Sequence, residues 1–198
     1  WWFPVLGYSE QRAPVGLSAS GSDALAFHNY QLSAAWDFKL DTAQASLQYS
    51  YVDRLFLSYQ RLNEVVLDNN DDLAFSTNRD VIAATLAFPY RKLLYQNNFL
   101  FSAIHDRESL DNIGTVTPVN TSLDDNLIGI GWLFNGARIH PLSISRNDGL
   151  NLRLVAEDSD ALESDYTGQV YTLDLQQYIR TGKESVLALR FLQGWGND

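Results

Sequence analysis

Apolar and polar residues alternate along most of this chain with a period of two. Between residues 42 and 52 the odd positions are apolar or aromatic, from Ala43 to Tyr51, and the even positions are Gln or Ser. Side chains alternate between the two faces of a strand, so this pattern predicts a strand with one apolar and one polar face. No comparable stretch keeps the 3.6-residue period of a helix. The pattern predicts an all-β antiparallel chain with strands near residues 2–8, 14–20, 28–38, 43–51, 55–62, 81–90, 98–105, 127–135, 149–156, 169–179 and 186–195.

The polar face of these strands indicates which solvent meets the apolar face. Its positions are mostly Ser, Thr, Gln, Asn, Gly and Ala, whereas a soluble sandwich covers its outer face with charge. A transmembrane barrel turns its apolar face to lipid and its polar face to the lumen. Composition agrees, because 45% of the residues are hydrophobic and only 19% are charged, against about 25% in average soluble domains. We therefore predict a transmembrane β-barrel, with a soluble β-barrel or sandwich that binds an apolar ligand as the alternative.

The predicted connections differ in length and charge. From residue 60 onward the long ones, 61–80, 106–125 and 157–168, alternate with shorter ones at 91–97, 136–148 and 180–185. Outer-membrane barrels have long extracellular loops and short periplasmic turns. The long connections hold fifteen acidic residues against three arginines, whereas the shorter ones, with 52–54, hold seven basic residues against three acidic ones. Two ends of opposite charge predict a fixed orientation across a membrane.

This orientation assigns positions to the aromatic and charged residues of the strands. Aromatic rings collect at the two headgroup levels of a membrane. The expected outer girdle is Trp36, Tyr59, Tyr171 and Trp195, and the expected periplasmic girdle is Tyr30, Tyr51, Tyr90, Phe99 and Trp132. A charge that faces lipid at the midplane costs about 2–4 kcal/mol, so charges that depart from the apolar pattern are expected to face the lumen. These lumen charges are Asp37, Arg153, Asp174 and Arg190.

Net charge and residue types restrict the classes of partner and chemistry. The formal net charge of −10 and the pI near 4.6 argue against nucleic acid, which needs a basic face. The chain lacks cysteine, so it has no disulfide or thiolate metal site. It also lacks methionine and begins at Trp1, which we interpret as a processed or excised piece. We expect one β-barrel domain over residues 1–198, no enzyme activity and no cofactor.

Candidate catalytic and metal-binding residues are sparse. Ser102 and Ser109 flank His105 and Asp106, but Ser102 and His105 have opposite parity on a strand, so a catalytic triad is not expected. The acidic clusters lack the spacing and central glycine of an EF-hand, and we interpret them as solvated groups with incidental attraction for Ca²⁺ or Mg²⁺. They are Asp68/Asp71/Asp72, Asp124/Asp125 and Glu157/Asp158/Asp160.

Several segments resemble BamA-type barrels, the bacterial surface antigen superfamily. The segments similar to its tenth and eleventh strands are Ser164-Asp165-Tyr166, Tyr171 to Tyr178, Val186 to Arg190 and Gly194-Trp195-Gly196. Ser143 to Gly149 is similar to the turn before strand nine in the branch fused to a periplasmic β-propeller, and Val15 to Leu25, with His28 and Tyr30, resembles the early strands of that branch. The resemblance is a dispersed pattern over most of the chain rather than a tight motif.

The resemblance carries its own expectations. It implies a sixteen-stranded barrel in the bacterial outer membrane, of which this chain is the front part, incomplete at its C-terminus and without the periplasmic N-terminal domain. It implies a non-enzymatic role in protein insertion or export, or in anchoring a periplasmic module, with a loosely paired first strand. The expected partners are outer-membrane lipid, lipopolysaccharide and a periplasmic domain or other outer-membrane proteins. A passive porin-like channel for small solutes is the alternative.

Overall fold

The chain forms an all-β fold. The computed structural model describes residues 1–9, 12–67, 73–112, 122–139, 146–182 and 185–197. These contain twelve strands and one short 3-10 helix, η1 (Asp160–Leu162). The strands are β1 (Trp2–Leu6), β2 (Pro14–Ser22), β3 (His28–Asp37), β4 (Thr42–Tyr51), β5 (Leu55–Leu67), β6 (Leu73–Arg91), β7 (Gln96–Asn112), β8 (Ser122–Asn135), β9 (Arg138–Ile139), β10 (Arg146–Asp158), β11 (Gln169–Arg180) and β12 (Val186–Asn197).

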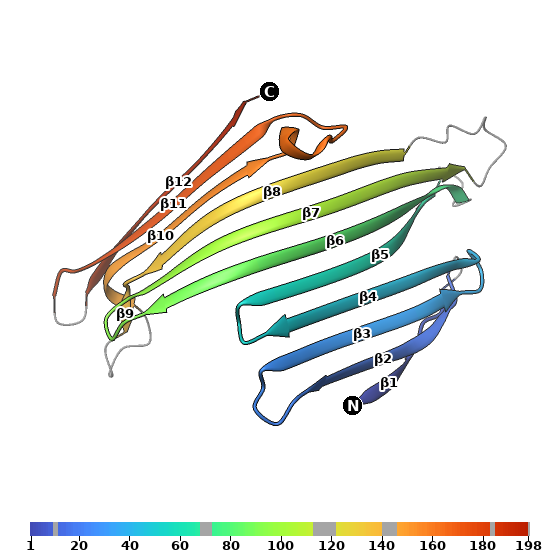
Figure 1. Ribbon diagram of the computed structural model, residues 1–198, viewed down its shortest axis with the longest axis horizontal. Helices are drawn as coiled ribbons and strands as arrows, with labels where there is room; N and C mark the ends of the chain where they lie inside the picture. The colour runs from blue at the N-terminus through green and yellow to red at the C-terminus, as the bar shows by residue number, and fades with distance from the viewer. Residues whose placement is uncertain (10–11, 68–72, 113–121, 140–145, 183–184, 198) are drawn as a thin grey trace. The chain divides into compact units, whose positions relative to one another are not determined.

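The strands form one antiparallel sheet whose order follows the chain. The order runs from β1 to β8 and continues through β10 and β11 to β12, while the two-residue β9 pairs only with β10 (Figure 1). Within the described residues, no ladder joins β1 to β12, so the sheet is not closed. The prediction of an all-β antiparallel chain is confirmed. No helix in the described part of the chain has the length and apolar character needed to cross a membrane.

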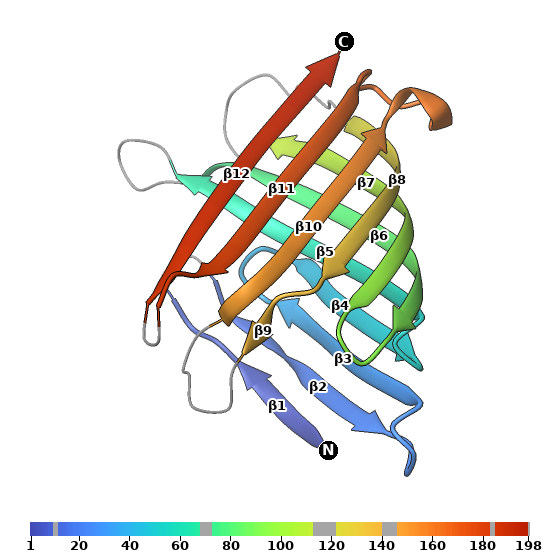
Figure 2. The ribbon, with the colours of Figure 1, turned by 90° about the vertical axis from the view of Figure 1, so that its left-hand side faces the viewer.

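The chain divides into two compact units. Unit 1 comprises residues 1–85 and 103–126, and unit 2 comprises residues 86–102 and 127–198. In unit 1, β1 to β5 pair in sequence, and β2 and β4 lie on either side of β3 in continuous register. In unit 2, β10, β11 and β12 lie side by side, and β11 and β12 pair from Gln169 with Asn197 to Arg180 with Val186 (Figure 2).

A tight turn joins β4 to β5. Its two central residues, Val52 and Asp53, have φ angles of 49° and 52°. Two consecutive positive φ values match the twist of a β-hairpin turn, which the Arg54 amide closes by donating a 2.9 Å hydrogen bond to the Tyr51 carbonyl. Tyr51 lies opposite Leu55, so three residues connect the two strands. The short connection over 52–54 agrees with the sequence, although a β-branched valine is an unusual residue for this conformation.

Strands β5 to β8 are longer than the alternating pattern predicts. The expected long connections at 61–80 and 106–125 are wrong, because β5 continues to Leu67, β6 begins at Leu73, β7 continues to Asn112 and β8 begins at Ser122. In these extensions apolar and polar residues no longer alternate: residues 65–67 and 73–75 are apolar at consecutive positions, and residues 76–80 are polar at consecutive positions. The period of two therefore disappears although the strand continues. Many acidic residues assigned to loops therefore lie on strands: Glu64, Asp80, Asp106, Glu108, Asp111, Asp124 and Asp125.

Candidate functional site: the two faces of the sheet

The apolar residues of β3 are more exposed than most of its polar residues. Tyr30, Leu32 and Trp36 are 46%, 39% and 43% exposed. On the opposite face Ser33 is half-buried and Asp37 is fully buried. A water-soluble sheet has the reverse arrangement, with its apolar face covered. The register places this face of β3 beside the alternating apolar residues of β4, so the exposed apolar surface continues onto the next strand.

The same inversion occurs in β6, where Ile82, Leu86, Phe88 and Tyr90 are exposed and Ala87 is buried. Ala87 is the single buried hydrophobic residue among those described. A protein that buries its apolar side chains against a second layer has many such residues. Within each unit, the described strands expose an apolar face without a hydrophobic core behind it.

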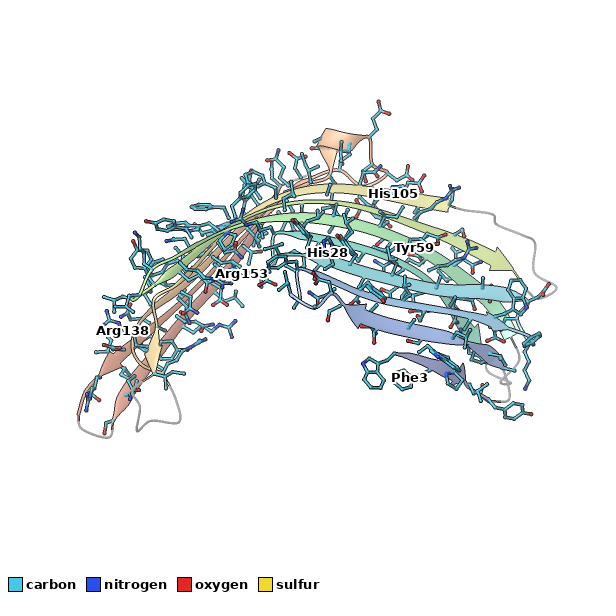
Figure 3. The ribbon with its side chains drawn as sticks, turned by 60° about the horizontal axis from the view of Figure 1, so that its bottom comes forward. Phe3, His28, Tyr59, His105, Arg138 and Arg153 are labelled. Carbon is cyan, nitrogen blue, oxygen red and sulfur yellow. The ribbon has the colours of Figure 1, made fainter. Side chains whose placement is uncertain are left out.

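The expected girdle aromatics of unit 1 lie on this apolar face. Tyr30 faces Tyr49 and Trp36 faces Ala43 on β4, while Tyr51 faces His28. Tyr59 is less exposed, and its hydroxyl donates a 3.0 Å hydrogen bond to Asp80. Figure 3 shows the side chains on the two faces of the strands, with Tyr59 on β5. Each ring thus has the parity that the sequence predicts, and its depth in a membrane stays a prediction.

The girdle aromatics of unit 2 make specific contacts. The rings of Phe99 and Trp132 stack with their centroids 6.2 Å apart, and the Trp132 indole donates a 3.0 Å hydrogen bond to the Asn97 side chain. Tyr171 and Trp195 are register partners on β11 and β12. The remaining girdle residue, Tyr90, is half exposed and lies under the Lys92 ammonium at 5.2 Å from its ring centre. Indole and phenol groups with one polar partner suit a boundary between apolar and aqueous surroundings.

Asp37, an expected lumen charge, is the centre of a buried polar cluster. Its side chain has no solvent exposure. It accepts hydrogen bonds from the backbone amides of Ala13, Lys39 and Leu40 and, at 3.2 Å, from the Arg12 guanidinium. Arg12 also donates a 3.0 Å hydrogen bond to the carbonyl of Asn63. The carboxylate therefore joins the β1–β2 and β3–β4 connections, and Arg12 links both to β5.

The other three expected lumen charges share one face of unit 2. Arg153 and Asp174 are direct register partners. Asp174 also accepts hydrogen bonds of 2.9 and 2.8 Å from Arg190. All three lie on the face opposite Leu154 and Leu173. They form one mixed-charge group on the polar face, and whether this face lines a lumen stays a prediction.

Ion pairs cross the extended ends of β5 to β8 in unit 1. Arg79 donates two-point hydrogen bonds to Asp106, and the hydrogen bonds and charge of this carboxylate raise the pKa of Arg79. On the apolar face, the Arg61 guanidinium lies 4.0 Å from the Asp80 carboxylate. Arg107 and Asp124 are 3.6 Å apart. The described part of the acidic end is thus partly neutralised by arginine within the sheet.

Two glycines of β8, Gly129 and Gly131, lie on the polar face of unit 2, and only the first has a close neighbour. A Cβ atom at Gly129 would lie 2.6 Å from the hydroxyl of Ser102 and 3.5 Å from Glu157. A Cβ atom at Gly131 would meet Leu100 at 3.4 Å, an ordinary contact. The absence of a side chain at Gly129 therefore has a steric cause: Ser102 occupies the space in which a side chain would lie.

Among the described residues, those considered for catalysis and metal binding do not form a site. The His105 imidazole makes a 2.6 Å hydrogen bond with Asn126, and Asp106 pairs with Arg79. Neither forms a triad with Ser102, which lies beside Gly129. The described residues contain no group of three His, Asp or Glu side chains able to hold a metal ion. The expected cluster Asp68/Asp71/Asp72 lies outside the described residues.

The sequence interpretation did not identify Arg12 as a partner of Asp37 or Arg79 as a partner of Asp106. Arg12 lies in a turn 25 residues before Asp37, and alternation gives no information about turns. For the second pair a signal exists: Arg79 and Asp106 keep the parity of the polar face beyond the ends of the predicted strands. No protein-family model matches this chain, and no curated protein matches it.

Proposed function

We propose that this chain is part of a β-barrel that spans a bacterial outer membrane. The single observation that carries the proposal is the inverted burial of the strands: alternating large apolar side chains are exposed, and the polar ones opposite them are less so. Exposed apolar patches on soluble monomers rarely exceed a few hundred Å². Hydrocarbon is a solvent in which such a face is stable, and a closed barrel satisfies every backbone group there.

The proposal requires that the open sides of β1 and β12 are paired in the whole protein. An unpaired strand edge in hydrocarbon costs several kcal/mol for each unsatisfied group. The similarity to BamA-type barrels supplies a solution, a barrel of sixteen strands in which this chain forms the front part. The apolar spans support this reading, because β6 alternates from Ile82 to Tyr90, close to the 9–11 residues that a tilted strand needs to cross a bilayer.

The role we propose is non-enzymatic. The protein assists insertion or export of outer-membrane proteins or anchors a periplasmic module, and its partners are outer-membrane lipid, lipopolysaccharide and those proteins. This rests on the resemblance of the segments near Ser143 to Gly149 and Tyr171 to Tyr178.

Two measurements on the full-length protein test this proposal. After cell fractionation, the protein is expected in the outer membrane and to resist alkaline extraction, whereas recovery in buffer without detergent contradicts it. In proteoliposomes, it is expected to accelerate the folding of an eight-stranded barrel protein, followed by its heat-modifiable gel mobility. In planar bilayers a large steady conductance, together with no acceleration, favours a passive pore instead.

A further inference from the structure

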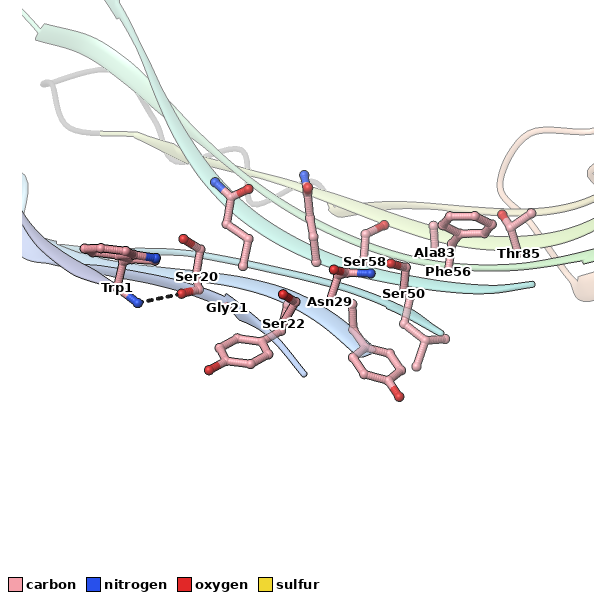
Figure 4. A pocket seen from close by; sticks show the side chains of 15 residues that line it. Trp1, Ser20, Gly21, Ser22, Asn29, Ser50, Phe56, Ser58, Ala83 and Thr85 are labelled. Carbon is pink, nitrogen blue, oxygen red and sulfur yellow. Dashed lines mark hydrogen bonds between the residues drawn. The ribbon is translucent and has the colours of Figure 1, made fainter. Parts of the chain in front are cut away.

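A neutral groove crosses the polar face of unit 1. It has a volume of about 810 Å³ and is lined from β2, β3, β4, β5 and β6 (Figure 4). None of the described residues that line it has a charged side chain, although 38 of the 198 residues of the chain are Asp, Glu, Lys or Arg. The side chains of the groove therefore offer no counter-charge to an ionic ligand, and the amino group of Trp1 donates a 2.8 Å hydrogen bond to the Ser20 carbonyl.

Two parallel rows of side chains form its floor. The register aligns them across four strands, so that each member faces the next at the spacing of neighbouring strands, about 4.8 Å. We call them the neutral rows. The first is Ser20, Gln31, Gln48 and Ser58, and the second is Ser22, Asn29, Ser50 and Phe56.

The groups of the first neutral row are available to a ligand. Among the described residues, no hydrogen bond engages the side-chain amide of Gln31 or Gln48. The adjacent row differs, because Ser33 and Ser46 bond to each other at 2.7 Å. Each free amide offers two donors and an acceptor at an exposed position. The side chains of Ser33 and Ser46 are thus hydrogen-bonded to each other, whereas the neighbouring amides of Gln31 and Gln48 remain open to a ligand.

Aromatic rings lie at the two sides of the groove. Phe56 departs from the polar pattern of its face and is 41% exposed. Trp1, whose backbone pairs with Ser20, lines the other side at 90% exposure (Figure 4). An exposed aromatic ring on an otherwise polar face offers an apolar surface against which an apolar part of a ligand can pack.

We infer that this groove binds a neutral polyhydroxylated ligand, an oligosaccharide by chemical class. A hydroxyl both donates and accepts, which matches the paired amides of Gln31 and Gln48. The apolar C–H face of a sugar ring matches the rings of Trp1 and Phe56. An extended peptide is disfavoured, because it binds a sheet by joining the ladder at an edge, and the backbone groups of β3 and β4 are already paired on both sides. The inference does not depend on membrane insertion, since the face is polar in either environment.

The test is calorimetric titration of the full-length protein in a zwitterionic detergent without a sugar headgroup. The probes are maltohexaose and cellohexaose, with hexagalacturonate as the anionic counterpart and polyethylene glycol of similar mass as the neutral control without hydroxyl rows. At least one neutral hexasaccharide is expected to bind, and the anionic one is expected to bind more weakly by about tenfold or more.

Matched variants connect the binding to the groove. Gln31→Ala combined with Gln48→Ala is expected to weaken binding about tenfold or more, and so is Phe56→Ala. Ser33→Ala combined with Ser46→Ala, one row away, is expected to change binding less than about twofold. Circular dichroism verifies that each variant is folded. The inference is overturned if neither neutral hexasaccharide binds, if the glutamine variant binds like the wild type, or if hexagalacturonate or polyethylene glycol binds equally well.

Discussion

Asp174 on β11 and Arg190 on β12 form a two-point ion pair although they are not register partners. Arg190 faces Gln176, and Asp174 faces Leu192, so the pair runs diagonally across the ladder. The hydrogen bonds measure 2.9 and 2.8 Å, and Arg153 faces Asp174 from β10. One carboxylate therefore lies between two arginines on the polar face of unit 2.

This arrangement predicts unequal effects of the single substitutions. Asp174→Ala leaves Arg153 and Arg190 without their shared carboxylate, so it is expected to lower the urea midpoint more than Arg190→Ala, after which Arg153 still faces Asp174. The double variant is expected to be no less stable than Asp174→Ala, because the interaction is already lost. Urea unfolding of the four proteins measures this cycle. Additive effects of the two substitutions contradict a direct ion pair.

Asp37 is expected to be the most sensitive carboxylate of unit 1. Asp37→Ala removes the acceptor of three backbone amides and the Arg12 guanidinium at a fully buried position. We expect the free energy of unfolding to fall by about 2–3 kcal/mol, measured by urea unfolding. Asp41→Asn is the control, because Asp41 is exposed in the same connection and has a φ of 55°, which asparagine tolerates. Equal losses for the two variants contradict the buried cluster.

Gly129 is expected to require the absence of a side chain because of Ser102. Gly129→Ala places a methyl group 2.6 Å from the Ser102 hydroxyl, and we expect a loss of about 1 kcal/mol or more in thermal or urea unfolding. Adding Ser102→Ala to this variant removes the clashing oxygen and is expected to restore most of the loss. Gly131→Ala, with its nearest contact at 3.4 Å, is expected to be neutral. Equal effects at the two glycines would show that the contact with Ser102 is unimportant.

Adjacent positions of β10 distinguish a lipid-facing surface from a water-facing one. Leu154 lies on the exposed apolar face and Val155 on the opposite face, between Arg153 and Glu157. In the membrane, Leu154→Arg is expected to cost about 2–4 kcal/mol and Val155→Arg much less, measured by urea unfolding from phospholipid vesicles. In water an exposed Leu154→Arg would be nearly neutral, so similar stability of the two variants contradicts a lipid-facing Leu154.

The alternating segments could be predicted from the sequence because the polarity of each residue there indicates the face of the strand on which it lies. The residues from Ile82 to Tyr90 and from Leu150 to Ala156 form strands with the expected parity. Asp174 and Arg190 could be placed on one face for the same reason, since parity survives a small error in a strand end. Alternation within one segment does not identify the solvent or the protein surface that contacts each face.

The strand extensions and the turn contacts could not be predicted in this way. Before Ile82, β6 extends back to Leu73. Its residues 73–75 are apolar on both faces and its residues 76–80 are polar on both faces, so no alternation marks the strand there. The Arg12 to Asp37 contact depends on how two turns fold together, which alternation does not encode. The register between neighbouring strands could not be predicted from the pattern either, and this register places Gln31 opposite Gln48.

The most direct test of the account measures which solvent contacts each side chain along β10. The chain has no cysteine, so single cysteines at residues 150 to 156 can each carry one nitroxide label in the full-length protein reconstituted into vesicles. We predict that collisions with oxygen peak at the even positions, from Leu150 to Ala156, and that collisions with a water-soluble nickel complex peak at the odd ones, from Asn151 to Val155. Even positions that are shielded from both agents, or equally open to the nickel complex, would contradict the claim that hydrocarbon covers the apolar face.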